Sequence, residues 1–153
     1  MTQPVSIRGA TLADAPALVD FNRAMARETE NKDLPREVIS AGVEALLSDA
    51  RHGFYVVAEA DGRLVAGLMV TFEWTDWRNG LFWWIQSVYV SPDYRRRGIY
   101  RQLYDFVKHR AAAEGNVRGF RLYVEKDNAS AQAVYQTLGM AETHYKMYEE
   151  PAR

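Results

Sequence analysis

Three consecutive arginines followed by a glycine, Arg95 to Gly98, form the stretch of this chain best suited to chemistry. Guanidinium groups bind phosphate through paired N–H donors. A glycine lets an anion come close to the backbone, and a helix that starts there adds free N–H groups and the positive end of its dipole. The pattern therefore predicts an anion-binding loop. Charge alone is equally compatible with a solvated basic loop that only connects two elements.

The segments on either side fit a strand–loop–helix unit. Residues 85–90 are β-branched or aromatic, which predicts a strand, and Ser91-Pro92-Asp93 ends it because proline donates no backbone hydrogen bond. After Gly98, apolar residues recur at helical spacing and predict a helix with one face toward a core. These residues are Ile99, Leu103, Phe106 and Val107.

This unit resembles the acetyl-coenzyme A motif of the GNAT N-acetyltransferases, usually written Q/R-x-x-G-x-G/A. Arg95 fills the first position and Gly98 the fourth, whereas Tyr100 stands where Gly or Ala is usual. A second segment is similar to the family's N-x-x-A-x-x-x-Y and L-G-F pattern. It contains Asn128, Tyr135 and Leu138-Gly139-Met140, and the two motifs come in the family's order.

The resemblance implies acetyl-coenzyme A as acyl donor. Backbone groups of residues 88–90 would meet its pantetheine arm, the loop after Tyr94 would cradle its pyrophosphate mostly through N–H groups, and Asn128 would add a contact. Strand pairing explains residues 88–90 equally well, and Asn128 also suits a helix N-cap. The cofactor-binding residues implied are Val88, Tyr89, Val90, Arg95, Arg96, Arg97, Gly98, Ile99, Tyr100, Arg101 and Asn128.

In this family a tyrosine at the position of Tyr135 reprotonates the coenzyme A thiolate, so the resemblance implies a general acid. The alternative is a core tyrosine with a satisfied hydroxyl. The amine must also lose a proton, and Glu73 and Glu125 are both candidates to accept it, against the alternative of surface carboxylates. Ribosomal-protein N-terminal acetyltransferases have a glutamate five residues before the asparagine, where this chain has Tyr123, so their mechanism does not transfer directly.

The resemblance implies that a polar loop of this chain forms part of the acceptor side, and aromatic residues elsewhere could contribute to it. The four tryptophans crowd around one turn, where they pack a hairpin or wall an acceptor pocket. Acidic residues of a predicted polar loop could attract a cationic amine, although a solvated loop explains them too. The residues concerned are Trp74, Trp77, Trp83, Trp84, Glu28, Glu30 and Asp33.

Composition excludes several other functions. The chain has 153 residues, a net charge of −1 and no cysteine. We therefore expect a single domain over residues 1–153, no disulfide, and no nucleic-acid or membrane partner. No histidine has a partner at metal-ligand spacing, so no metal site is expected. A cytoplasmic location is compatible with this composition.

The element pattern predicts a mixed α/β fold. The helix after Gly98 makes a crossover, so the fourth and fifth strands should be parallel in an otherwise antiparallel sheet flanked by helices. The resemblance implies the GNAT-like acyl-coenzyme A N-acyltransferase fold, whose fourth and fifth strands splay apart around the cofactor. The predicted strands are 5–8, 54–60, 64–74, 81–90, 120–124 and 140–148, and the predicted helices are about 11–28, 35–47, 98–114 and 128–138.

Two functions follow. The first is an N-acetyltransferase that moves an acetyl group directly from acetyl-coenzyme A to a primary amine, on a small molecule or a peptide, within a ternary complex. The second is a non-catalytic acyl-coenzyme A-binding sensor, which needs the loop but neither Tyr135 nor a base. The aromatic last strand would suit a homodimer.

Overall fold

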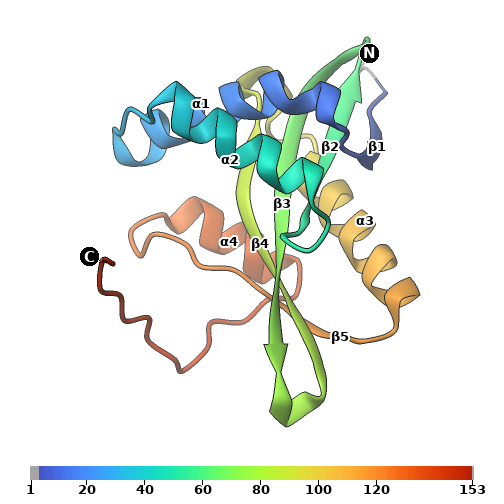
Figure 1. The fold of residues 1–153 in the computed structure, drawn as a ribbon, viewed down its shortest axis with the longest axis vertical. Helices are drawn as coiled ribbons and strands as arrows, with labels where there is room; N and C mark the ends of the chain where they lie inside the picture. Colours follow the sequence, from blue (N-terminus) through green and yellow to red (C-terminus); the bar gives the residue numbers. More distant parts are fainter. Residues whose placement is uncertain (1–3, 153) are drawn as a thin grey trace. The chain divides into compact units, whose positions relative to one another are not determined.

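The computed structural model describes residues 4–152, and the part up to Leu122 is built on a five-stranded sheet (Figure 1). The strand order is β1-β2-β3-β4-β5, and all neighbours are antiparallel except β4 and β5. The predicted mixed, mostly antiparallel sheet with strands 4 and 5 parallel is therefore confirmed. The strands are β1 Ser6–Gly9, β2 Phe54–Ala60, β3 Arg63–Thr75, β4 Gly80–Val90 and β5 Val117–Arg121.

Helices cover both faces of this sheet. Leu18 of the first helix and Val43 of the second pack in one buried cluster with Tyr55 and Val57 of β2. Side chains alternate along a strand, so Val56, which is also buried, faces the opposite side, where the third helix contacts the sheet. The helices are α1 Ala15–Glu30, α2 Arg36–Ser48, α3 Ile99–Glu114 and α4 Ala129–Thr137. None in the described part of the chain is long and apolar enough to cross a membrane.

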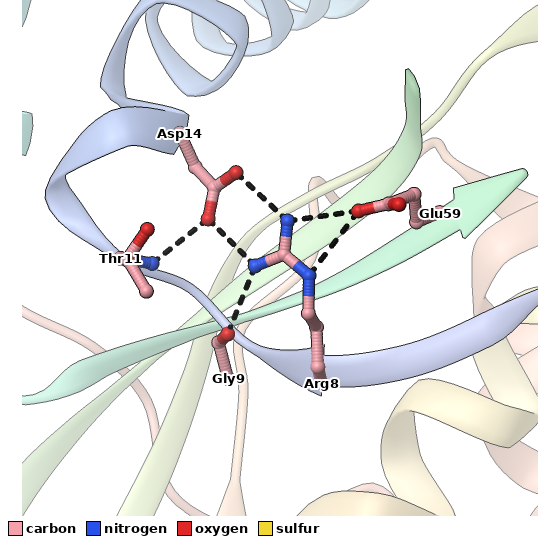
Figure 2. Close-up of polar contacts among 5 residues, drawn as sticks. All are labelled: Arg8, Gly9, Thr11, Asp14 and Glu59. Carbon is pink, nitrogen blue, oxygen red and sulfur yellow. Dashed lines mark hydrogen bonds and ion pairs between the residues drawn. The ribbon is translucent and has the colours of Figure 1, made fainter. Parts of the chain in front are cut away.

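The start of α1 is tied to the sheet by one arginine (Figure 2). The Arg8 guanidinium donates to both carboxylate oxygens of Asp14, at 2.8 and 3.0 Å, and to Glu59 at 2.9 Å. Asp14 also accepts the Thr11 backbone N–H at 2.8 Å, which is one of the hydrogen bonds of a capping box. The Arg8 hydrogen bonds lower the pKa of the Asp14 carboxyl, so this carboxylate stays charged.

A bulge bends β4 where it pairs with β3. Gly67 pairs with Tyr89 and Met69 pairs with Gln86, so Leu68 alone stands opposite two residues of β4. One of them, Ser87, has a left-handed backbone with φ 52°. An extra residue of this kind bends a strand and increases its twist.

The parallel ladder between β4 and β5 is short. It joins Leu81–Trp84 to residues 117–121 and ends at the pair Trp84 and Arg121. The fifth strand was predicted over 120–124 but begins at Val117. Only one residue separates this start from Gly115, the C-cap of α3. Residues 85–90 of β4 consequently have no ladder partner in β5. The predicted splaying of the two strands agrees with this pairing.

The predicted last strand, residues 140–148, is wrong. These residues join no ladder of the described chain, and residues 141–150 are exposed. Alternating aromatic residues make a strand only where a neighbouring strand supplies backbone partners. The argument for a homodimer through that strand loses its basis.

After Leu122 the chain forms a second compact unit. That unit contains α4 and the residues that follow it. The predicted helix 128–138 corresponds to α4, with Asn128 as its N-cap.

Candidate functional site

The arginine-rich loop has the backbone of an anion site. After β4, residues 92–94 make one tight turn, and Arg96 and Gly98 then have positive φ values of 64° and 73°. Tyr94 before these residues and Ile99 after them are both buried, so the loop is fixed at both ends. Gly98 is the N-cap of α3, as the sequence predicted.

The first amides of α3 have no acceptor in a preceding turn of the helix. The Gln102 N–H donates to the Gly98 carbonyl at 3.2 Å, and this is the first hydrogen bond of the helical pattern. The N–H groups of residues 99–101 come before it, so no helical carbonyl accepts from them. A Cβ on Gly98 would meet no atom within 4 Å, so the space beside this N-cap is open. Open space, amides at a helix start and nearby guanidinium groups fit a diphosphate.

The arginines of the loop differ in their surroundings. Arg96, Arg97 and Arg101 are exposed, and no carboxylate of residues 4–152 pairs with them. Arg97 lies over the ring of Tyr94, 5.1 Å from its centroid. Arg95 instead turns toward α1 and bonds Glu28. The sequence predicted the same cofactor-binding role for all four arginines, whereas in the structure only Arg95 has a carboxylate partner among the described residues.

Glu28 belongs to the last turn of α1, which continues to Glu30 and not only to residue 28. Its carboxylate accepts Arg95 Nη2 at 2.8 Å and the Tyr89 hydroxyl at 3.3 Å. Burial raises the pKa of Tyr89, and the neighbouring Glu28 carboxylate raises it further. Glu28 was predicted as one of several acidic loop residues, but its partners were not. Tyr89 and Arg95 follow Glu28 by 61 and 67 positions in the sequence, and no local sequence pattern connects residues so far apart.

The candidate base Glu73 is part of another cluster on the extended β3–β4 hairpin. Its Oε1 accepts the Trp84 indole N–H at 2.8 Å and Arg121 Nη1 at 3.2 Å. Arg121 also lies over the Phe82 ring, 3.6 Å from the centroid. The Glu73 carboxylate therefore already holds two donors, and the role of Arg121 had no signal in the sequence.

The four tryptophans divide into different environments. Trp83 is buried and contacts the rings of Phe54 and Phe72, as expected for packing. Trp74 and Trp77 are exposed on the hairpin. Only Trp84 meets one of the candidate catalytic residues of the first unit.

The remaining candidates lie in the second unit. The Asn128 side chain accepts the Ala131 N–H at 3.2 Å, so it caps α4 as predicted. The Glu125 carboxylate accepts the Asp127 N–H at 2.7 Å and stabilises the turn before that cap. Burial raises the pKa of the Tyr135 phenol. Tyr135 lies seven positions after Asn128, which is about two helical turns and places both on one face of the helix.

Comparison with known proteins identifies the chain's relatives. The family model "Acetyltransferase (GNAT) family" matches residues 16–140. A possible acetyltransferase from Clostridium difficile 630 is 46% identical, with a TM-score of 0.91 over 97% of this chain and 98% of that one. No curated protein sequence matches.

More distant structures share the fold. The aminoglycoside N-acetyltransferase AAC(6')-Iy, solved with a coenzyme A bisubstrate analogue, is 20% identical, with a TM-score of 0.78 over 98% of this chain and 99% of that chain. A ribosomal-protein-alanine N-acetyltransferase from Brucella melitensis biovar Abortus 2308 is also 20% identical, with a TM-score of 0.78 over 98% of this chain and all (100%) of that chain. The expected GNAT-like fold is thus confirmed.

Proposed function

The chain belongs to the acetyltransferase (GNAT) family, and from that premise we propose that it is an acetyl-coenzyme A-dependent N-acetyltransferase acting on a primary amine. The observation that carries the proposal is the loop at Gly98. There, a left-handed glycine, open space and the amides at the start of α3 provide a site for a diphosphate. The proposed acceptor is a small molecule or a peptide, and the proposed location is cytoplasmic.

The cofactor would be held along two stretches of backbone. The loop amides and the exposed arginines would bind its phosphates. Residues 88–90 lie where β4 has no ladder partner in β5, so backbone groups of Val88 and Tyr89 are the candidates for the pantetheine amides, whereas the Val90 carbonyl already accepts a hydrogen bond from Arg95. When bound, acetyl-coenzyme A supplies an acetyl group activated as a thioester. The backbone amide of Tyr89 would be the donor aimed at the thioester oxygen.

Tyr135 is the proposed proton donor. Burial raises the pKa of its phenol, so the hydroxyl is protonated at neutral pH and can give its proton to the departing sulfur. Asn128 would add its contact while capping α4. The amine's proton has two candidate acceptors, Glu73 and Glu125, and each already accepts a hydrogen bond from another residue of the protein.

This engagement of both carboxylates is what favours a second candidate, an acyl-coenzyme A sensor without catalysis. The two functions differ in one measurement, the release of free thiol from acetyl-coenzyme A in the presence of a panel of amines. Release with any amine, lost in Tyr135→Phe, supports the transferase. Binding of acetyl-coenzyme A without release supports the sensor.

The first experiment is calorimetric titration with acetyl-coenzyme A of the wild type and of Gly98→Glu. The substitution places a carboxylate and a strained backbone in the phosphate loop, so binding should be lost. Gly115→Glu is the matched control, because Gly115 caps the other end of the same helix at φ 83° with equally open surroundings. It should bind as the wild type does. Absence of binding by the wild type would remove the proposal.

A further inference from the structure

Arg95 commits two of its five N–H donors to other parts of the protein. Its Nε donates to the Val90 carbonyl at 2.8 Å, and its Nη2 donates to Glu28 Oε2 at 2.8 Å. The guanidinium also lies over the Tyr89 ring, with Cζ 5.5 Å from the centroid. Three contacts in different directions fix this planar group, which is less free to turn toward a ligand than an exposed arginine.

Glu28 completes a cross-link among three segments. Its second oxygen accepts the Tyr89 hydroxyl, so one carboxylate joins α1 to both β4 and the loop. The Tyr89 ring packs against Phe21 of α1, with 5.2 Å between centroids. The anchor is firm because α1 contributes Leu18 and Val19 to the buried cluster under the sheet.

The loop needs such an anchor. Arg96 has a left-handed backbone, which is unfavourable for a residue with a Cβ, and Gly98 has many alternative conformations. A loop of this kind pays ordering entropy when it binds a ligand unless its conformation is fixed beforehand. Arg95 directly precedes Arg96, so its ion pair with Glu28 holds the chain just before the first residue of the loop with a positive φ.

We propose that Arg95 is a positioning residue, which holds the phosphate-binding loop in its binding conformation through Glu28 and Val90 and does not itself donate to the cofactor's phosphates. This inference rests on the proposed function, since it concerns the same acetyl-coenzyme A site. It assigns Glu28, on a separate helix, a part in cofactor affinity. It also assigns direct phosphate contact to Arg96, Arg97 and Arg101 alone among the loop arginines.

The two possible roles of Arg95 predict opposite effects of Glu28→Ala on the affinity for acetyl-coenzyme A. If Arg95 positions the loop, Glu28→Ala releases the loop and weakens acetyl-coenzyme A binding, by roughly threefold to tenfold for a half-exposed pair with added hydrogen bonds. If Arg95 donates to phosphate, Glu28 competes for it, and Glu28→Ala strengthens binding. Isothermal titration calorimetry with acetyl-coenzyme A measures the sign directly.

A double-mutant cycle measures the coupling between Arg95 and Glu28 in cofactor binding, which a general loss of stability would not produce. Arg95→Ala should weaken binding at least as much as Glu28→Ala, because it also removes the hydrogen bond to Val90, and the double variant should be no weaker than Arg95→Ala alone. Arg95→Lys separates the roles again. Lysine still attracts phosphate but cannot bridge Val90 and Glu28 together, so the positioning role predicts weakened binding, whereas the phosphate role predicts retained binding. Glu28→Gln keeps an acceptor oxygen and should recover part of the affinity.

Arg8→Ala is the matched control. Arg8 has similar side-chain exposure, 39% against 44% for Arg95, and pairs with Asp14 at the opposite end of α1. It should lower stability while leaving the acetyl-coenzyme A dissociation constant within about twofold. Tighter or unchanged binding by Glu28→Ala, or full additivity in the cycle, would overturn the inference while leaving the proposed function intact. Absence of binding by the wild type would overturn both.

Discussion

At the scale of single residues, local chemistry was readable from the sequence and distant pairing was not. Gly98 could be placed at a helix start because a glycine between a strand and an amphipathic helix is a local pattern. The cap formed by Asn128 is equally local. The partner of Arg95 is 67 positions away, so only the folded chain brings it to Glu28.

Tyr135 carries the first residue-scale prediction. Tyr135→Phe should lower turnover by roughly 10²-fold, because a positioned proton donor contributes about that much, and should leave the acetyl-coenzyme A dissociation constant within about twofold. Steady-state rates with an accepted amine and calorimetry measure the two quantities. Burial raises the pKa of this phenol above its usual 10.0, so the Tyr135-dependent rate should not fall until the pH exceeds about 10. Unchanged turnover would remove Tyr135 from this role.

Ser87 carries the second prediction. Its left-handed backbone at the bulge suits asparagine far better than a β-branched residue. Ser87→Val should lower the free energy of unfolding by about 1–3 kcal/mol, whereas Ser87→Asn should be near neutral. Urea denaturation compares the two variants. Equal stabilities would mean that the bulge does not hold this residue at positive φ in solution.

At the scale of elements, the predictions succeeded where hydrophobic pattern and pairing agree. The strand 54–60 has the predicted bounds because a strong hairpin turn at residues 61–62 ends it. The strand predicted over 140–148 failed because its pattern has no neighbouring strand to complete it. The shift of β5 to Val117–Arg121 has a similar cause, since pairing with β4 sets its bounds and residue type alone does not.

The junction between β1 and α1 gives a prediction of pH dependence. Hydrogen bonds from Arg8 lower the pKa of Asp14, so the folded state favours the ionised form. The stabilisation is therefore present above the unfolded pKa, near 3.8, and is lost as the pH falls through the lower folded value. Asp14→Asn should lower the free energy of unfolding by about 1–2 kcal/mol at pH 7, and the difference should shrink in acid.

Urea denaturation across pH measures this effect, and Asp20→Asn provides the control. Asp20 pairs with Arg36, but both side chains are largely exposed, so its loss should matter little. A penalty for Asp14→Asn that stays constant down to acid pH would show that the ion pair is not its source.

At the scale of the whole molecule, charge is balanced and only locally uneven. The chain has 19 Lys and Arg against 20 Asp and Glu, so the net charge of −1 gives no general attraction for an anionic ligand. Attraction for the phosphates must therefore come from the loop. Within it, Arg95 is neutralised by Glu28, whereas Arg96, Arg97 and Arg101 have no carboxylate partner among the described residues.

This distribution predicts how salt acts on cofactor binding. Raising NaCl from about 50 to about 500 mM should weaken acetyl-coenzyme A binding by roughly threefold to tenfold, because salt screens exposed charges beyond a few ångströms. Arg96→Gln with Arg97→Gln should weaken binding at low salt and flatten the salt dependence. Replacing both members of the pair, Arg95→Gln with Glu28→Gln, should weaken binding but keep the wild-type salt dependence, because the pair that is removed has no net charge. A flattened dependence in this variant would place the Arg95 guanidinium on the phosphates, and an unchanged dependence in Arg96→Gln with Arg97→Gln would place the attraction outside the loop.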